Sequence, residues 1–215
     1  MAKYPVVVYG ASGYTGMLIM DWLIDQQIPF TAVARNAKRV QEMMAERVVR
    51  LESATYEIVE TEHTVDALVK AFKGAKVVCN TVGPFVNFGL TTVEAALKAG
   101  CHHIDTTGEQ GYIRAVRDQF GDLYRQAGLV VSPSTAYMYT FAEIAAELAL
   151  ETHGVDVLET ATLCRGPRFD AAGVTVGSTA SIFELFRSEH CYLWERKLVP
   201  HAPGTTANVV DPGFV

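Results

Sequence analysis

The sequence has few cysteines, and they are not arranged to bind a metal ion. No Cys-x-x-Cys pair occurs, which excludes a zinc ribbon, and the wide spacing argues against a disulfide framework. The four cysteines are Cys79, Cys101, Cys164 and Cys191. His102 and His103 are neighbours, so on a strand they would point to opposite faces. We therefore expect reduced thiols in a cytoplasmic protein, and no metal site.

The chain also lacks long hydrophobic runs and an excess of positive charge. No apolar stretch approaches the roughly 20 residues that span a bilayer, and no signal-peptide pattern opens the chain. We therefore expect no transmembrane segment. The formal net charge is -6. Surfaces that bind nucleic acids gather Lys and Arg, so this acidic balance argues against a nucleic-acid partner.

Several catalytic signatures are missing as well. The chain has no His-Glu-x-x-His, no Gly-x-Ser-x-Gly and no cluster of Cys and His. No Tyr is followed four residues later by Lys, since Tyr192 has Arg196 at that position. The missing pair argues against a short-chain dehydrogenase.

The most informative stretch lies near the N-terminus. A β-branched run at 6–9 reads as a buried strand, glycines follow at Gly10, Gly13 and Gly16, and a helical pattern begins at about Gly13. Strand, glycine turn and helix in this order predict a dinucleotide-binding turn. Spaced glycines alone would also suit an ordinary tight turn. The residues expected around the pyrophosphate are Gly10, Ala11, Ser12, Gly13, Tyr14, Thr15 and Gly16.

Strand and helix patterns alternate through the first 150 residues. Further strands are expected at 28–35, 56–59, 76–82, 101–105 and 129–133. Further helices are expected at 37–47, 65–72, 91–99, 111–127 and 140–150. This alternation predicts an α/β fold, namely a doubly wound parallel Rossmann sheet with strand order 3-2-1-4-5-6.

The end of the second predicted strand carries cations. NAD sites usually have Asp or Glu there, whereas this sequence has Arg35, Asn36, Lys38 and Arg39, with no carboxylate in the stretch to repel a phosphate. A guanidinium with further cations suits the 2′-phosphate, so the sequence favours NADP(H). The other interpretation is a solvated start to a basic helix.

Two more strand ends would border the nicotinamide half of the cofactor. The fourth strand ends in Asn80, Thr81, Val82, Gly83 and Pro84. The fifth ends near Asp105 and Glu109, whose carboxylates could orient a substrate or relay a proton. Plainer interpretations are a strand-ending turn at Gly83-Pro84 and a turn-capping role for Asp105.

The motifs together resemble the saccharopine dehydrogenase-like family, which includes the trans-acting enoyl reductases. GASGYTG, VARN, NTVGPFVNFG and VEAALKAGCHHIDTTGE occur in the expected order within about residues 5–150. The resemblance implies an NADP-dependent oxidoreductase that transfers a hydride to or from a C=C or C=N bond of a small-molecule substrate. It implies cofactor contacts from Gly10, Gly13, Gly16 and Arg35, with Asn80, Gly83, Pro84, Asp105 and Glu109 around the cleft.

Two departures from this family concern the substrate side. After the sixth strand the chain reads SPSTAYMY instead of a glycine-rich segment, so Tyr137 and Tyr139 join Asp105 and Glu109 as catalytic candidates. The family's chains are also considerably longer. A non-catalytic NADP(H)-binding sensor or scaffold is therefore the alternative function.

The pattern changes near residue 153. We expect an NADP-binding domain at 1–153 and the start of a substrate or dimerisation domain, a small and incomplete α+β segment, at 154–215. In this segment 157–164 reads as a strand, 178–194 as a helix, and 200–215 has no regular period. The apolar side chains of 178–194 predict a homodimer, because leaving them in water would be costly. The other possibility is that the segment folds back over its own nucleotide domain.

Overall fold

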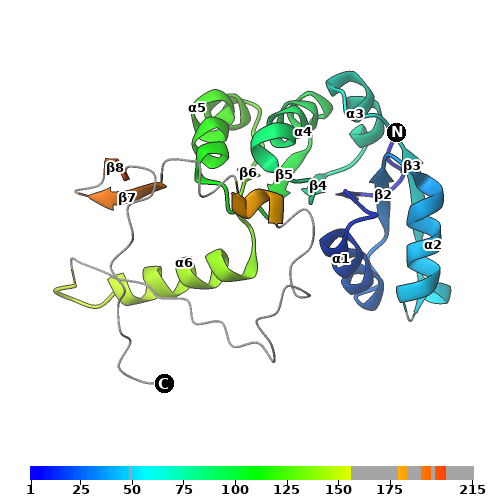
Figure 1. Cartoon of the computed structure of the whole chain (residues 1–215), viewed down its shortest axis with the longest axis horizontal. Helices are drawn as coiled ribbons and strands as arrows, with labels where there is room; N and C mark the ends of the chain where they lie inside the picture. Colours follow the sequence, from blue (N-terminus) through cyan, green and yellow to red (C-terminus); the bar gives the residue numbers. More distant parts are fainter. Residues whose placement is uncertain (49, 156–178, 184–189, 195–196, 202–215) are drawn as a thin grey trace.

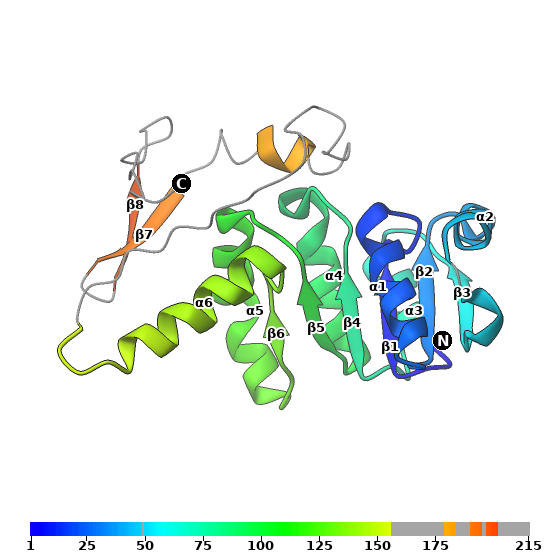
Figure 2. The same cartoon turned by 90° about the horizontal axis from the view of Figure 1, so that it is seen from below.

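The centre of the fold is a six-stranded parallel sheet. The computed structural model describes residues 1–48, 50–155, 179–183, 190–194 and 197–201. Its strand order is β3-β2-β1-β4-β5-β6, which confirms the predicted Rossmann topology (Figure 2). The strands are β1 Val6–Tyr9, β2 Phe30–Ala34, β3 Tyr56–Glu60, β4 Val77–Asn80, β5 His102–Asp105 and β6 Val131–Ser132.

Helices cover both faces of the sheet. In Figure 1, α3, α4 and α5 lie on one face, while α1, α2 and α6 lie on the other. The helices are α1 Tyr14–Asp25, α2 Ala37–Arg47, α3 Val65–Phe72, α4 Phe85–Ala99, α5 Gln110–Gln126 and α6 Tyr137–Leu150, with a short 3₁₀ turn at Leu51–Ser53. No helix in the described ranges is both long and apolar enough to cross a membrane.

Successive residues of β1 enter cores on opposite faces of the sheet. Val7 packs in a buried cluster with Leu68 of α3, and Val8 packs in another with Met20 of α1. All four side chains are fully buried. Alternation with a period of two is what a strand covered on both faces requires. The two buried clusters hold the six parallel strands so that their carboxyl ends lie at one edge of the sheet. Ligands bind at this edge in sheets of this kind.

Two helices begin earlier than the sequence predicts. α4 starts at Phe85 instead of residue 91, and α6 starts at Tyr137 instead of residue 140. For α4 the reason is a contact with a residue that is distant in the sequence. Pro84 directly precedes the first helical residue, and the carboxylate of Glu109 accepts hydrogen bonds from the first two backbone amides.

The predicted helix at 178–194 is wrong at 190–194. Residues 179–183 are helical, but β7 (His190–Trp194) is a strand that pairs antiparallel with β8 (Lys197–His201). Aromatic residues favour strands, and the partner strand supplies the backbone hydrogen bonds. Part of the stretch predicted as irregular, Pro200 and His201, lies in β8. The predicted strand at 157–164 lies outside the described residues.

Candidate functional site

The glycine turn folds tightly between β1 and α1. Gly10 has a φ of +89°, and its N–H donates to the carbonyl of Val33 at 3.0 Å. A Cβ at Gly10 would lie 2.5 Å from Oγ1 of Thr81, and a Cβ at Gly16 would lie 2.5 Å from the Gly10 carbonyl oxygen. Gly13 donates its N–H to that same oxygen at 2.8 Å. Side chains at Gly10 and Gly16 would fill the turn or force it open.

The first turn of α1 has no side-chain cap. Gly13 precedes the helix, and no side chain accepts a hydrogen bond there. By contrast, Asn36 caps α2 by accepting the N–H of Arg39 at 2.9 Å, and Thr64 caps α3. The first amides of a helix have no acceptor within it, and they carry the positive end of the helix dipole. The N-terminus of α1 is therefore suited to a phosphate.

The predicted 2′-phosphate site contains a carboxylate that the sequence did not reveal. Arg35, Lys38 and Arg39 are exposed at the end of β2 and the start of α2, as predicted. At the end of β3, however, Glu60 Oε2 accepts the N–H of Ala37 at 2.8 Å. The end of β2 itself has no carboxylate to repel a phosphate, as the sequence indicates. The parallel sheet places β3 beside β2, however, and β3 supplies the carboxylate of Glu60.

His63 is a second residue that sequence reasoning missed. Its Nδ1 lies 2.7 Å from the hydroxyl of Tyr9, and the two rings stack with centroids 6.0 Å apart. The His63 ring also packs edge to face against the Phe88 ring, with the two ring centroids 5.2 Å apart. Burial and the charge of Arg35 lower the pKa of His63, while burial raises the pKa of Tyr9 to about 12. No sequence motif marks His63, because its partners come from distant elements.

The turn after β4 is bonded to the last residue of β1, which directly precedes the glycine turn. Thr81 donates to the Tyr9 carbonyl oxygen through its N–H at 2.9 Å and through its hydroxyl at 3.0 Å. Asn80 is buried and accepts the N–H of Val82 at 2.9 Å, and Gly83-Pro84 is a cis peptide. The turn predicted to border the nicotinamide ribose thus lies beside the predicted pyrophosphate site.

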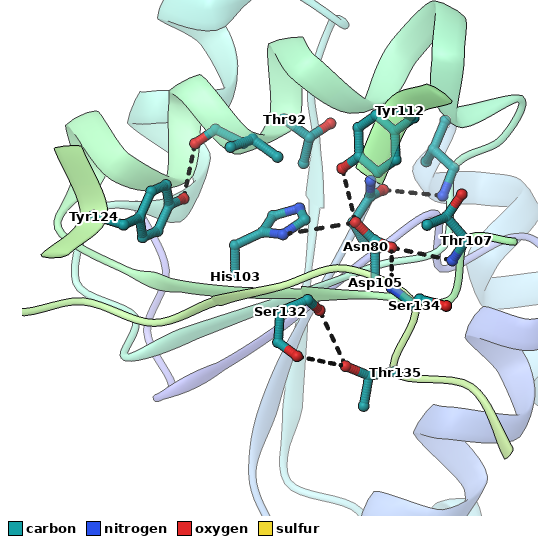
Figure 3. A network of polar contacts seen from close by, with 12 residues as sticks. Asn80, Thr92, His103, Asp105, Thr107, Tyr112, Tyr124, Ser132, Ser134 and Thr135 are labelled. Carbon is teal, nitrogen blue, oxygen red and sulfur yellow. Dashed lines mark hydrogen bonds and ion pairs between the residues drawn. The ribbon is translucent and has the colours of Figure 1, made fainter. Parts of the chain in front are cut away.

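Asp105 is at the centre of a buried polar network (Figure 3). Its Oδ1 accepts the N–H groups of Thr107 at 3.0 Å and Ser134 at 3.1 Å, and its Oδ2 accepts the hydroxyl of Tyr112 at 2.7 Å. Burial outweighs these bonds and raises the pKa of Asp105. His103 Nδ1 lies 3.8 Å from Oδ2, and burial lowers the pKa of this imidazole to about 3. The imidazole is therefore neutral.

Glu109 joins three segments at the ends of β4 and β5. Oε1 accepts the N–H of Phe85 at 3.0 Å and the hydroxyl of Ser181 at 2.7 Å, and Oε2 accepts the N–H of Val86 at 2.7 Å. The residue is 4% exposed. The carboxylate therefore caps α4 and fixes residues 179–183 at the carboxyl edge of the sheet.

The two predicted tyrosines lie on the first turn of α6. Tyr137 is 66% exposed and Tyr139 is 36% exposed. The Tyr139 hydroxyl sits against the α-carbon of Gly108, where a Cβ would collide with it. A groove of about 490 Å³ runs beside Tyr139, lined also by Thr135, Glu143 and other residues of the β6–α6 connection and α6. The catalytic roles of Asp105, Glu109 and both tyrosines stay predictions.

The described residues show no grouping of three or more His, Cys, Asp or Glu that could hold a metal ion. Three cysteines in these ranges are free thiols: Cys79, Cys101 and Cys191. Cys164 lies outside them. Burial raises the pKa of Cys79 to about 11, so this thiol is not activated as a nucleophile.

Relatives of this chain include named oxidoreductases. A trans-acting enoyl reductase of Mycobacterium ulcerans is 30% identical over 114 residues, which are 52% of this chain and 27% of that protein. A saccharopine dehydrogenase-like oxidoreductase of Mus musculus is 25% identical over 147 residues, 62% of this chain and 34% of that protein. A lipid droplet localized protein of Caenorhabditis elegans is 29% identical over 138 residues, with coverages of 61% and 32%. The matched part is about a third of these relatives' length.

A solved structure and a family model also match this chain. The saccharopine dehydrogenase (L-Glu forming) of Saccharomyces cerevisiae superposes with a TM-score of 0.53 at 16% identity, covering 70% of this chain and 31% of that chain. This likeness concerns the fold alone. The named relatives confirm the resemblance to the saccharopine dehydrogenase-like family that the sequence motifs indicate. A family model described as NAD(P)H-binding matches residues 10–158, more than half of the chain, and the chain belongs to this NAD(P)H-binding family.

Proposed function

We propose that this chain is the NADP(H)-binding part of an oxidoreductase that transfers a hydride to or from a C=C or C=N bond. The observation that carries the proposal is the uncapped first turn of α1 behind a turn that has no room for side chains at Gly10 and Gly16. Such a turn fits a pyrophosphate, because the phosphate oxygens accept the amides that α1 leaves without a side-chain cap. Gly10, Gly13 and Gly16 would hold this part of the cofactor, together with the amides of residues 11–15.

The adenosine end supports NADP(H) over NAD(H). Arg35 is exposed at the end of β2, with Lys38 and Arg39 following on α2. Charge-assisted contacts to a phosphate contribute about 1.5–3 kcal/mol, or roughly ten- to a hundredfold in affinity. Glu60 opposes this preference, so the expected selectivity for NADPH is the difference between the two effects. Displacing an exposed carboxylate from one amide costs less than the guanidinium–phosphate pair gains.

At the other end, the chain positions the nicotinamide and the substrate. The bound nicotinamide supplies or accepts the hydride. The turn at 80–84 borders the ribose, and Tyr137 and Tyr139 are the proposed proton donors, because both are exposed near the β5 end. Asp105 accepts a backbone amide of the loop after β5, and Glu109 accepts the first backbone amides of α4, which favours positioning roles for both.

The proposal includes the division of the chain and its setting. We place the nucleotide domain at 1–153 and the start of a substrate or dimerisation domain at 154–215. We propose a small-molecule substrate, a homodimer and a cytoplasmic location. One relative is named for lipid droplets, so that surface is the location to compare with the cytoplasm.

Nicotinamide fluorescence titration tests the cofactor assignment. We expect NADPH to bind more tightly than NADH, and Arg35→Asp to remove roughly a factor of ten or more from NADPH affinity alone. Lys70→Ala, at an exposed position of α3, is the control. Equal affinities in the wild type, or an unchanged preference in Arg35→Asp, would refute the assignment. Consumption of NADPH with enone or imine acceptors separates the enzyme from the alternative, a sensor or scaffold that binds without turnover.

A further inference from the structure

Gly108 and Tyr139 come from different elements and meet at the carboxyl edge of the sheet. Gly108 lies in the loop after β5, and Tyr139 lies on the first turn of α6. A Cβ at Gly108 would collide with the hydroxyl oxygen of Tyr139 and would lie 3.3 Å from its Cζ. The Tyr139 hydroxyl therefore packs against the loop backbone, in space that only a glycine leaves open.

Asp105 holds both sides of this contact (Figure 3). On the loop side, its Oδ1 accepts the N–H of Thr107 at 3.0 Å, and the Thr107 hydroxyl accepts the N–H of Glu109 at 3.0 Å. On the helix side, the same Oδ1 accepts the N–H of Ser134 at 3.1 Å, and the Asp105 carbonyl oxygen accepts that of Thr135 at 2.7 Å. The loop and the start of α6 are thus fixed relative to each other through one residue.

Tyr139 is the better placed of the two tyrosines for contact with a substrate. It is 36% exposed, compared with 66% for Tyr137, so packing fixes its position more firmly. Tyr139 lines the groove of about 490 Å³ beside α6, and Tyr137 is not among the described residues that line it. The Tyr139 hydroxyl has no hydrogen-bond partner among the described residues. Its proton is therefore available to a molecule in the groove.

We propose that Tyr139, and not Tyr137, donates the proton in the reaction, and that Gly108 is the positioning residue that keeps the Tyr139 hydroxyl in place. This inference rests on the proposed hydride transfer. In the reducing direction the hydride adds to one atom of the C=C or C=N bond, and the π electron pair takes the proton from the Tyr139 oxygen at the other atom. The phenolate left behind regains a proton from solvent at the open groove. A displacement of about 1 Å at such a group costs roughly a hundredfold in rate.

Gly108→Ala moves the hydroxyl without requiring the backbone to move. Gly108 is not among the glycines with a positive φ, so the loop backbone accepts alanine. The atom in the way is the end of a side chain, so we expect the tyrosine to rotate about its side-chain bonds. Tyr139→Phe removes the oxygen that collides with the new Cβ. Because the two substitutions act on one contact, their effects should not be additive.

The test measures NADPH consumption by the full chain at saturating NADPH, with cyclohexenone and with pyrroline as acceptors. We expect kcat to fall by roughly a hundredfold or more in Tyr139→Phe, the size of a general-acid contribution. Gly108→Ala should lower kcat by roughly tenfold or more, with KM and NADPH affinity nearly unchanged. The double variant should be no slower than Tyr139→Phe alone. Gly111→Ala is the matched control, because an added Cβ there meets no atom within 4 Å, and it should keep the wild-type kcat.

Urea unfolding tests the contact independently of turnover. Gly108→Ala should lower the unfolding midpoint in the wild type, and it should lower the midpoint less in Tyr139→Phe, where the colliding oxygen is absent. Equal losses in the two backgrounds would overturn the positioning role. Should Gly108→Ala alone not fold, a folded double variant would support the contact, and an unfolded one would overturn it.

The kinetic outcomes separate this inference from the proposed function. A larger loss of kcat in Tyr137→Phe than in Tyr139→Phe would overturn the choice of donor and leave the hydride transfer intact. Losses from Gly108→Ala and Tyr139→Phe that multiply in the double variant would show general damage to the site, and Gly108 would lose its positioning role. If NADPH binds but neither acceptor is reduced, the donor role falls together with the hydride transfer, and only the NADP(H) site remains.

Discussion

The carboxylate of Glu109 accepts the backbone N–H of Val86 at 2.7 Å across 23 residues of sequence. Through this bond and its partner bond to Phe85, the loop after β5 fixes the start of α4 at the carboxyl edge of the sheet. The same carboxylate also accepts the hydroxyl of Ser181. One buried side chain therefore connects the nucleotide fold to the following segment.

Replacing this carboxylate should destabilise the fold. Glu109→Gln puts an amide NH₂ group where one backbone N–H now finds an acceptor, and a buried unsatisfied donor costs about 1–3 kcal/mol. We expect a loss of this size in urea unfolding. Glu62→Gln, at an exposed position, is the matched control and should change stability by less than about 0.5 kcal/mol. Equal effects of the two substitutions would contradict the capping role.

The glycine turn should tolerate no side chain at Gly13. Gly13→Val places atoms where the pyrophosphate is expected, so cofactor binding should be lost while the circular dichroism spectrum is retained. A matched control is Gly121→Val on α5, where an added Cβ meets no atom within 4 Å. A folded Gly13→Val protein with normal NADPH affinity would show that the cofactor binds elsewhere.

Glu60 should limit the preference for NADPH. Its carboxylate holds the Ala37 amide beside the proposed phosphate position, and its charge repels a phosphate. Glu60→Gln keeps an oxygen for that amide and removes the charge, so NADPH affinity should rise several-fold while NADH affinity stays the same. Fluorescence titration at low and high salt measures both, and the gain should shrink as salt rises. An unchanged NADPH affinity would place the phosphate away from Glu60.

Acid should destabilise the protein through His103. The folded state keeps this imidazole neutral with a pKa of about 3, whereas the unfolded chain protonates it below about 6.5. Its contribution to stability is complete above pH 6.5 and is lost as the pH falls toward 3. Between pH 7 and pH 5 this amounts to about 2 kcal/mol. The pKa of Asp105 is raised, so its contribution has the opposite sign and grows as the pH falls.

Substitution isolates the His103 effect. His103→Leu should show a smaller stability loss between pH 7 and pH 5 than the wild type, by about 2 kcal/mol in urea unfolding. His153→Gln, at an exposed site, should keep the wild-type pH dependence. A His103→Leu protein with that same dependence would mean that other groups cause the acid sensitivity.

The proposed homodimer is tested by light scattering. The intact chain should scatter as a dimer, and a version ending at His153 should be monomeric, because the proposed interface lies beyond it. Ile182 and Phe183 are 41% and 63% exposed. Exposed apolar side chains that lie together are typical of a surface that binds another chain. A monomeric intact chain would refute the dimer. A shortened chain that stayed dimeric would move the interface to the nucleotide domain.

The sequence by itself determined the order of strands and helices up to about residue 150. β-branched runs and glycine punctuation are local signals, so the ranges of α2 and α3 came out as predicted. The strand order also followed, because alternating βα units permit few topologies. The glycine turn and Arg35 lie at the ends of β1 and β2, where the sequence placed them.

Only the tertiary structure decided the contacts between distant residues. Glu60 reaches Ala37 across 23 residues, and His63 reaches Tyr9 across 54. The start of α4 and the strand character of β7 likewise depend on partners far along the chain. Such contacts are set by the register of the sheet and by how its helices pack on it, and neither leaves a signal in local sequence. The charge balance of the proposed cofactor site therefore depends on β1, β2 and β3 lying side by side.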